Sequence, residues 1–214
     1  MKKIISIIML LVISTDAWAQ KTIATMTTTA DKVFLFVVWN GAGEIFANGV
    51  SLRNDLKGNS SITPNSEGKV ILTATDDALL TELYCNHNQL TALDISNSMA
   101  LTVLYCYDNR LTTLDVSNRS KLIMLYCSYN LLTTLDVSKC TKLEGLGCFN
   151  NQLTDLNVRN CTALIYIGCY NNQLTALDVS DCTALLNLEC YNNPLTALDV
   201  SSCTELNGNS YLTE

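Results

Sequence analysis

The chain has 214 residues, of which 48% are hydrophobic and 15% are charged, and its formal net charge at pH 7 is −7. This length is enough for one domain, and the apolar content is enough for a continuous core. A nucleic-acid-binding protein needs a basic face, whereas here the Lys and Arg residues are scattered singly along an acidic chain. The composition therefore argues against nucleic acid and against an anionic membrane surface as partners.

The first 19 residues have the pattern of a secretory signal peptide. Lys2 and Lys3 precede an apolar stretch over residues 4–13, and residues 17–19 (Ala-Trp-Ala) supply the small side chains that a signal peptidase reads. The apolar stretch is short for a membrane-spanning helix, so an uncleaved anchor is the less favoured alternative. We expect cleavage after Ala19 and an exported protein that is extracellular, at the cell surface or periplasmic, with no transmembrane segment in the mature chain.

Residues 20–78 lack the repeat that follows and are predicted to be rich in β-strands. A β-branched and aromatic run, Lys32–Asn40, is followed by two short strands, Glu44–Ala47 and Val50–Arg53, around the turn signal Asn48-Gly49. Residues 55–68 are predicted to be a polar loop, and Lys69–Thr75 a further strand. Because an open solenoid end exposes leucines and strand edges, we interpret this region as an N-terminal cap. A small β-sandwich with its own ligand is the alternative.

From residue 79 to residue 205 the sequence contains six repeats with a period of 21 residues. Each has the order Leu-x-x-Leu-x-Cys-x-x-Asn-x-Leu, which in the first repeat places Leu80, Leu83, Cys85, Asn88 and Leu90. Self-similarity at this period indicates a solenoid, and the order of the residues is that of a leucine-rich repeat.

The repeat pattern predicts the fold class. Three residues near each Leu-x-Cys segment should form a strand that pairs in parallel with the next repeat, about 4.8 Å away. The second half of each repeat has no helical periodicity and is predicted to be extended or tightly turned. We therefore predict a leucine-rich-repeat solenoid, a parallel-sheet right-handed superhelix with mostly β-strands and turns, little helix, and a small β-rich N-terminal cap. Residues 206–214 are interpreted as a truncated seventh repeat or C-terminal tail.

Ten cysteines, all within the repeats, form two columns of equivalent positions. An even number in an exported chain usually indicates disulfides. Neighbours that are in register, however, point their Cβ atoms the same way, which suits a disulfide poorly. Because other repeats fill both positions with small or apolar side chains, we interpret the cysteines as buried free thiols, with disulfides as the alternative. No Cys-x-x-Cys pair supports a metal site. The columns are Cys85, Cys106, Cys127, Cys148, Cys169, Cys190 and Cys140, Cys161, Cys182, Cys203.

Two polar columns are predicted to be structural. One is an asparagine ladder that satisfies backbone groups where the chain leaves each strand: Asn88, Asn109, Asn130, Asn151, Asn172 and Asn193. The other is a column of carboxylates on the convex side, which should accept hydrogen bonds from N–H groups in turns: Asp94, Asp115, Asp136, Asp178 and Asp199. A calcium ladder is the alternative for the carboxylates, but the glycine-rich loops of calcium-binding repeats are missing.

The outward positions of the strands are the candidate binding surface. Alternation from the inward Leu and Cys places many aromatic side chains on the concave face. Tyrosine is typical of recognition surfaces because it is large, stiff and has one polar tip, although cross-strand stacking alone would also explain the pattern. Gly145, Gly147 and Gly168 are expected to leave a shallow dip. The predicted ligand-binding residues are Tyr84, Tyr105, Tyr107, Tyr126, Phe149, Tyr166, Tyr170 and Tyr191.

The repeated pattern Leu-Thr-x-Leu-Asp-Val-Ser-x-Cys-Thr-x-Leu, continued by Leu-x-Cys-x-x-Asn-Gln, resembles the secreted bacterial leucine-rich repeat proteins of the internalin-like kind. The resemblance covers residues 79–206. It implies an exported, non-catalytic recognition or adaptor module. This sequence departs from the usual pattern by placing Cys at the third leucine position of the strand.

The residues favour binding over catalysis. The single histidine, His87, lies beside the asparagine column, and no nucleophile elbow, phosphate loop or metal motif is present, so we predict no catalytic residue, cofactor or metal. The preferred function is recognition of a protein or peptide on the tyrosine-rich face. The alternatives are a glycan-binding module and a structural or assembly protein that associates through its C-terminal end.

Overall fold

The computed structural model describes residues 21–40, 44–52, 60–75 and 78–206. The predicted signal peptide, and the predicted tail from residue 207 onward, lie outside these residues. The described chain consists of strands and turns; none of it is α-helical, so it holds no helix that could cross a membrane.

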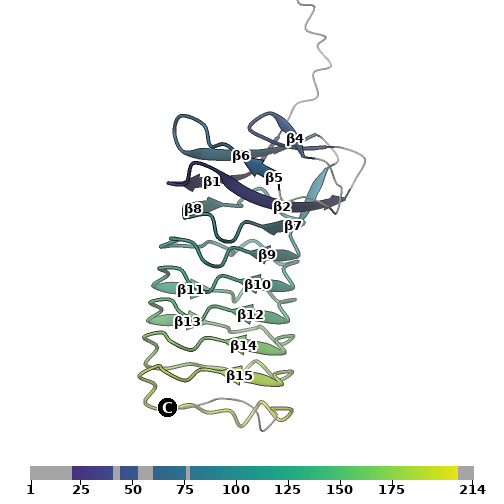
Figure 1. Ribbon diagram of the computed structural model, residues 1–214. Helices are drawn as coiled ribbons and strands as arrows, with labels where there is room; N and C mark the ends of the chain where they lie inside the picture. The colour runs from purple at the N-terminus through teal and green to yellow at the C-terminus, as the bar shows by residue number, and fades with distance from the viewer. Residues whose placement is uncertain (1–20, 41–43, 53–59, 76–77, 207–214) are drawn as a thin grey trace, which may run out of the picture.

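The repeats stack into a solenoid in which one short strand from each lies beside the next (Figure 1). Successive strands pair in parallel with a shift of 21 residues, so that Leu104 lies beside Leu125 and Leu125 beside Leu146. Leucine and cysteine point inward and the residues between them point outward. The strands are β7 (Leu79–Tyr84), β9 (Val103–Tyr105), β10 (Met124–Tyr126), β12 (Gly145–Gly147), β14 (Tyr166–Gly168) and β15 (Asn187–Glu189).

The second half of each repeat forms the opposite wall of the solenoid. Here the chain is extended and mostly turns, with strands β8 (Leu90–Asp94), β11 (Thr134–Asp136) and β13 (Asp155–Asn157). β11 and β13 pair in parallel, on the side of the stack away from β10 and β12 in Figure 1. The prediction of an extended wall without helical periodicity is confirmed for the described residues.

The N-terminal region folds as antiparallel strands. They are β1 (Lys21–Thr28), β2 (Val33–Asn40), β3 (Ile45–Ala47), β4 (Val50–Leu52), β5 (Ser60–Ile62) and β6 (Lys69–Ala74). Asn48 and Gly49 form the predicted hairpin turn with φ angles of 48° and 80°, the left-handed values that a type I′ turn requires. The prediction of one polar loop over residues 55–68 is wrong where β5 forms, because Ser60–Ile62 pairs with β2.

This region continues both walls of the solenoid. β2 pairs antiparallel with β7, and β1 pairs antiparallel with β8, so the open strand edges of the first repeat are used. Phe34 donates from its N–H to Asn88 Oδ1 at 2.7 Å, and its carbonyl accepts from Asn88 Nδ2 at 2.7 Å. β2 therefore supplies the backbone partners that a preceding repeat would supply. The predicted fold class, a leucine-rich-repeat solenoid with a β-rich N-terminal cap, is confirmed.

The core is a continuous column of leucine, valine and thiol side chains. All ten cysteines are free and buried, as expected for thiols that pack as small apolar groups. Burial raises the pKa of Cys85 from 9.0 to about 12 and that of Cys161 to about 11. The thiols therefore stay protonated at neutral pH. Because only the thiolate is reactive, they are inert there.

The second cysteine column does not consist only of small or apolar side chains, which corrects our expectation. Its first two positions hold Ser98 and Arg119, which are 3% and 2% exposed. Cys140 Sγ donates to the Val116 carbonyl at 3.4 Å, and Arg119 Nη1 donates to the equivalent Ile95 carbonyl at 2.9 Å. Arg119 is tolerated because its guanidinium donates to two backbone carbonyls, the second being that of Ser96.

A ladder of asparagine side chains connects each turn to the repeat before it. In one rung, Asn130 Oδ1 accepts from the buried Leu111 N–H at 2.9 Å, while Asn130 Nδ2 donates to the carbonyls of Cys106 and Cys127 at 3.0 Å. The same bonds recur at Asn109, Asn151, Asn172 and Asn193. Since buried backbone groups need partners, each repeat depends on the next for its polar groups.

The aspartates of the opposite wall accept hydrogen bonds from turn N–H groups, as predicted. Asp115 Oδ1 accepts from the Ser117 N–H at 2.9 Å, and the bond recurs at 2.8–3.1 Å from Asp94, Asp136, Asp178 and Asp199. The bonds to Ser117 lower the pKa of Asp115, because a hydrogen bond to a carboxylate favours its charged form. These carboxylates are turn-forming residues.

One position in each repeat has a left-handed backbone. Its residues are His87, Asp108, Tyr129, Asn150, Asn171 and Asn192, with φ angles between 52° and 59°. Asn and Asp adopt this conformation more easily than other residues with a side chain, whereas a bulky residue there is strained. In the last three repeats the asparagines form their own amide ladder, with 2.8 Å and 2.7 Å bonds. Tyr129 interrupts this pattern.

Replacing a ladder asparagine should strongly destabilise the fold. Asn130→Ala leaves the Leu111 N–H and two carbonyls without the partners that Asn130 supplies, so we expect the free energy of unfolding to fall by about 3–5 kcal/mol, at ~1–3 kcal/mol for each unsatisfied buried group. Urea unfolding followed by far-UV circular dichroism measures this. The exposed Asn118→Ala is the control and should change stability by less than about 0.5 kcal/mol; equal losses would contradict the ladder's role.

The buried thiols should make the fold sensitive to alkaline pH. The unfolded chain loses thiol protons near the ordinary pKa of 9.0, whereas Cys127 in the folded chain keeps its proton to about 12. The thiol contribution is therefore complete below about pH 8 and is lost as pH rises from 9 toward 11, because the folded state then binds more protons than the unfolded state. Urea unfolding at several pH values under reducing conditions should show this decline, and it should be shallower in Cys127→Ala.

Relieving the strain at Tyr129 should stabilise the protein. Tyr129→Asn places a residue suited to the left-handed backbone next to Asn150, so the free energy of unfolding should rise by roughly 0.5–1 kcal/mol despite the lost ring contact with Phe149. The reverse change one repeat further on, Asn150→Tyr, should lower it. Chemical denaturation of both variants provides the check, and a loss of stability in Tyr129→Asn would show that the ring contact dominates.

Candidate functional site

The outward side of the eight-stranded sheet carries all eight aromatic residues predicted from the sequence. We call this surface the tyrosine face. It consists of the outward side chains of the turns that follow the repeat strands and of the strands β2, β7, β9, β10, β12, β14 and β15. The strands alternate between buried and half-buried residues, which places the leucines in the core and the aromatic rings outside. Each of the eight rings is half-buried, so it contacts its neighbours and still reaches solvent.

The rings form two arrays. In the N-terminal half, Phe36, Tyr84, Tyr105 and Tyr126 follow one another with centroids 4.8–5.2 Å apart and planes inclined by 58–66°. Tyr107 lies beside Tyr105 at 6.4 Å. Inclined rings at this spacing attract through contacts of ring edge with ring face, so the array is held by its own packing.

The second array occupies the C-terminal half and lies one outward position further along the strands. Phe149, Tyr170 and Tyr191 are stacked with centroids 4.4 Å and 4.6 Å apart and planes within 8° of parallel. Tyr129 contacts Phe149 edge-on at 5.5 Å. Because each stacked ring covers the face of the next, this array presents ring edges and hydroxyl groups outward.

The three outward glycines give the rings space. A Cβ atom at Gly147 would lie 2.6 Å from Tyr126 Cδ1, and one at Gly168 would lie 2.3 Å from the Tyr166 hydroxyl. At Gly145 the obstructing atom is Met124 Sδ. The glycines are buried beneath these side chains, so the shallow dip expected from the sequence is filled, by the preceding repeat at Gly145 and Gly147 and by Tyr166 of the same strand at Gly168.

Two carboxylates on the tyrosine face are each bound by a phenol. Tyr84 donates to Glu82 at 2.8 Å, and Tyr166 donates to Glu189 at 3.1 Å. Burial, reinforced by these carboxylates, raises the pKa of both Tyr84 and Tyr166, and burial next to Tyr191 raises the pKa of Tyr170 to about 12. The phenols are therefore protonated donors at physiological pH.

Two buried polar atoms of the face have no hydrogen-bond partner among the described residues, Ser128 Oγ and Asn187 Oδ1. Ser128 is 2% exposed and occupies the same outward column as Tyr107 and Phe149. Its hydroxyl lies 3.5 Å from where a Cβ at Gly147 would be, at the junction of the two arrays. Unsatisfied buried polar atoms are uncommon, and this one lies within the candidate site.

Sequence analysis missed two aromatic residues of this surface. Phe34 and Phe36 extend it onto β2; Phe34 is 52% exposed and Phe36 contacts Tyr84. Alternation along Lys32–Asn40 places both outward, but their partner strand lies far away in sequence. Tyr129, which the sequence places on or beside this face but outside the eight predicted ligand-binding residues, is 53% exposed and occupies a turn position with a left-handed backbone.

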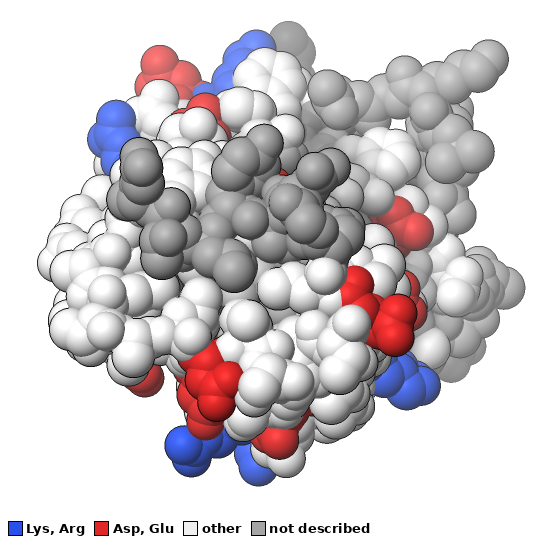
Figure 2. Space-filling view, turned by 90° about the horizontal axis from the view of Figure 1, so that it is seen from below, with Lys and Arg blue, Asp and Glu red and all other residues white. Residues whose placement is uncertain are grey.

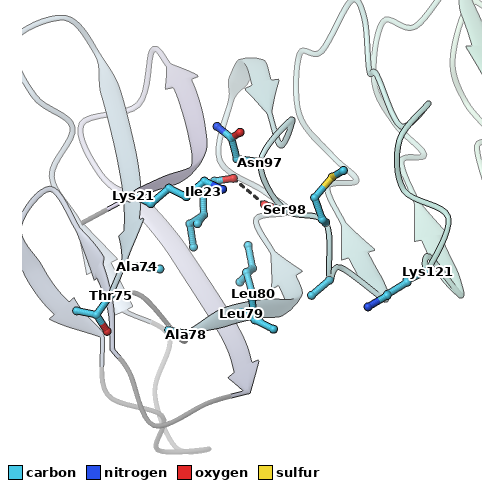
Figure 3. Close-up of a pocket in the computed structure, with 12 residues that line it drawn as sticks. Lys21, Ile23, Ala74, Thr75, Ala78, Leu79, Leu80, Asn97, Ser98 and Lys121 are labelled. Atoms are coloured by element: carbon cyan, nitrogen blue, oxygen red, sulfur yellow. Dashed lines mark hydrogen bonds between the residues drawn. The ribbon is translucent and has the colours of Figure 1, made fainter. Parts of the chain in front are cut away.

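A separate cavity of about 270 Å³ lies between the N-terminal sheet and the first repeat (Figure 3). Its lining includes Ile23 and Leu80, and the exposed side chains of Leu79 and Met99. Ser98 Oγ donates to the Ile23 carbonyl at 2.7 Å across the junction. Lys21 and Lys121 come from its two sides in Figure 3. The cavity is mainly apolar and holds no group suited to catalysis.

The remaining polar clusters do not form a catalytic arrangement in the described part of the chain. His87 Nδ1 pairs with Asp108, and its ring contacts Tyr107 edge-on at 5.0 Å. Both partners of this pair are well exposed, and the cysteines are buried in the core. No group of His, Cys, Asp and Glu among the described residues is arranged to hold a metal ion.

Comparisons with known proteins match the repeats. A family model described as the LVIVD repeat matches residues 104–131 and 164–193, less than half of the chain. A comparison with curated proteins gives no match. The solved functional domain of InlJ from Listeria monocytogenes, which includes a cysteine ladder, is 41% identical with a TM-score of 0.58; the match covers 59% of this chain and 28% of that one.

Two further structures are similar. A leucine-rich-repeat protein of Leptospira interrogans is 27% identical with a TM-score of 0.56, over 60% of this chain and 36% of that one. A Shigella effector leucine-rich-repeat domain is 28% identical with a TM-score of 0.50, over 55% of this chain and 52% of that one. The matches thus span between 28% and 52% of these relatives' lengths. The chain has a leucine-rich-repeat solenoid fold and is similar to bacterial leucine-rich-repeat proteins of the internalin kind.

Proposed function

We propose that the protein is an exported, non-catalytic recognition or adaptor module that binds a protein or peptide on its tyrosine face. The observation that carries this proposal is the pair of aromatic arrays, with centroid spacings of 4.4–5.2 Å. Packed rings lose little conformational freedom on binding, and tyrosine combines apolar area with a hydroxyl donor. The proposed export rests on the signal-peptide pattern of residues 1–19.

The strained backbone at Tyr129 is a second observation that supports binding at the tyrosine face. A bulky side chain in the left-handed region costs roughly 1 kcal/mol, and such strain is concentrated at functional sites. Here it places an exposed ring against Phe149, at the edge of the stacked array. We include Tyr129 in the proposed binding surface, together with the eight aromatic residues predicted from the sequence.

Ring geometry favours a polypeptide over a glycan. A sugar that stacks on an aromatic platform needs an open ring face, whereas the planes of Phe149, Tyr170 and Tyr191 lie within 8° of parallel and cover one another. Edges and hydroxyl groups suit the apolar side chains and backbone carbonyls of a polypeptide. Assembly through the C-terminal end has no comparable support in the described residues.

Truncating the rings should abolish ligand binding. A random 12-residue peptide display library, selected on the immobilised protein, provides the probe, and Kd values of the enriched peptides are then measured by fluorescence anisotropy. We expect Tyr105→Ala/Tyr126→Ala and Tyr170→Ala/Tyr191→Ala each to weaken binding by at least thirtyfold, since a buried aromatic anchor contributes about 2 kcal/mol or more.

The control for this experiment is Thr112→Ala/Thr113→Ala on the opposite wall, where both side chains are exposed. It should leave Kd unchanged, and circular dichroism should show that every variant is folded. The proposal would be contradicted if the enriched peptides bound the tyrosine variants as tightly as the parent protein. It would also be contradicted if the protein bound only to a glycan array and to no peptide.

A further inference from the structure

The charged side chains of the tyrosine face have one sign. Among the outward positions of the repeat strands, from Glu82 to Tyr191, the charged residues are Glu82 and Glu189. Glu144 is exposed on the flank of β12, and Asp108 lies in the adjoining turn. None of these outward positions holds Lys or Arg. Asp108 is already paired with His87, so the carboxylates that the face offers to a ligand are Glu82 and Glu189, with no Lys or Arg at an outward strand position beside them.

The basic residues of the repeats lie elsewhere. Arg119 is buried in the core, and Arg110 Nη1 reaches Thr29 in the N-terminal region at 3.4 Å. Arg159 pairs with Asp178 on the opposite wall at 3.5 Å. Lys121, Lys139 and Lys142 are exposed in the turns that join the two walls. Figure 2 shows the molecule from its last repeat, with charged side chains in separate small groups and much uncharged surface between them.

The two face carboxylates are oriented before a ligand arrives. Each is half-buried and accepts one hydrogen bond from a phenol: Glu82 from Tyr84 of the same strand, and Glu189 from Tyr166 of the preceding strand. A carboxylate has about four acceptor positions, so each keeps room for an ammonium or guanidinium group. Charge-assisted hydrogen bonds are roughly twice as strong as neutral ones, which makes a basic side chain the matching ligand group.

Their separation sets the length of a ligand that reaches both. Glu82 lies in the first repeat and Glu189 in the sixth, five strand spacings apart, or about 24 Å at ~4.8 Å per strand. An extended peptide covers this distance in about seven residues at ~3.3 Å per residue. Between the carboxylates lie the two aromatic arrays, which suit apolar side chains.

We propose that the partner of the tyrosine face is a polypeptide segment that carries two basic side chains about seven residues apart in an extended conformation, with apolar residues between them. Glu82 and Glu189 receive the basic groups, and the rings receive the apolar residues. The proposal rests on the proposed function and specifies its ligand.

The peptide selection described above tests this composition directly. The enriched 12-residue peptides should contain Lys or Arg at two positions six to eight residues apart, with a positive net charge. Replacing both basic residues of an enriched peptide by Gln should weaken its binding at least tenfold. Raising the salt concentration from 0.05 M to 0.5 M should weaken binding of the parent peptide, because salt screens charge pairs. Binding of the Gln peptide should stay nearly unchanged.

Matched protein variants locate the effect. The double variant Glu82→Gln/Glu189→Gln should weaken binding of the basic peptide by roughly tenfold and remove most of the salt dependence of its Kd. The control Glu205→Gln removes an exposed carboxylate away from the face and should not change Kd. Because Gln keeps the size and an acceptor oxygen, the double variant should fold normally, as urea unfolding can verify.

The outcomes separate the two proposals. The enriched peptides could require Tyr105 and Tyr126 and yet be neutral or acidic, or bind the Glu→Gln double variant equally well. Either result would overturn the proposal of a basic ligand and leave the proposed recognition by the tyrosine face standing. A selection that enriches no peptide above an unrelated solenoid control overturns recognition of a peptide and the basic ligand together.

Discussion

Each turn of this solenoid depends on an asparagine that belongs to the following repeat. The Nδ2 group of Asn130 bridges the carbonyls of Cys106 and Cys127, and its Oδ1 atom accepts the buried N–H of Leu111. A buried turn without these bonds would carry a penalty that the leucine contacts of one repeat could not offset. The stack is therefore held at one register, in which every repeat starts 21 residues after the last. Neighbouring repeats stabilise one another, as in other quasi-one-dimensional folds.

The same constraint explains how the N-terminal region is attached. The first ladder residue, Asn88, has no preceding repeat, and Phe34 of β2 provides both the N–H and the carbonyl that it needs. β2 thereby becomes an additional strand of the sheet and brings Phe36 into contact with Tyr84. The region that ends the stack thus also enlarges the aromatic surface.

Because leucine, thiol and asparagine occupy constant columns, variation between repeats is concentrated on the outside. The outward positions range from Gly to Tyr, and their arrangement is cooperative across strands: Tyr126 lies over Gly147, and Tyr166 reaches past Gly168 to Glu189. One aromatic ring, that of Tyr129, is held at a strained turn. A surface built of such rigid, interlocked side chains is suited to recognition, since little freedom remains to be lost on binding.

The period and the residue order alone determined the solenoid, the absence of helical periodicity in the second wall, the inward leucines and thiols, and the repeat in which each outward tyrosine lies. These features follow from local alternation and repetition, which one repeat already contains. Only the tertiary structure decided the antiparallel attachment of β1 and β2, the burial of Arg119, the filling of the space above Gly145 and Gly147, and the division of the rings into inclined and stacked arrays. Each of these depends on contacts between residues about 20 or more positions apart, where the side chains of adjacent strands compete for the same space and the same backbone partners. The sequence shows which residues face outward, but how their rings pack is settled only when neighbouring repeats are brought together at strand spacing.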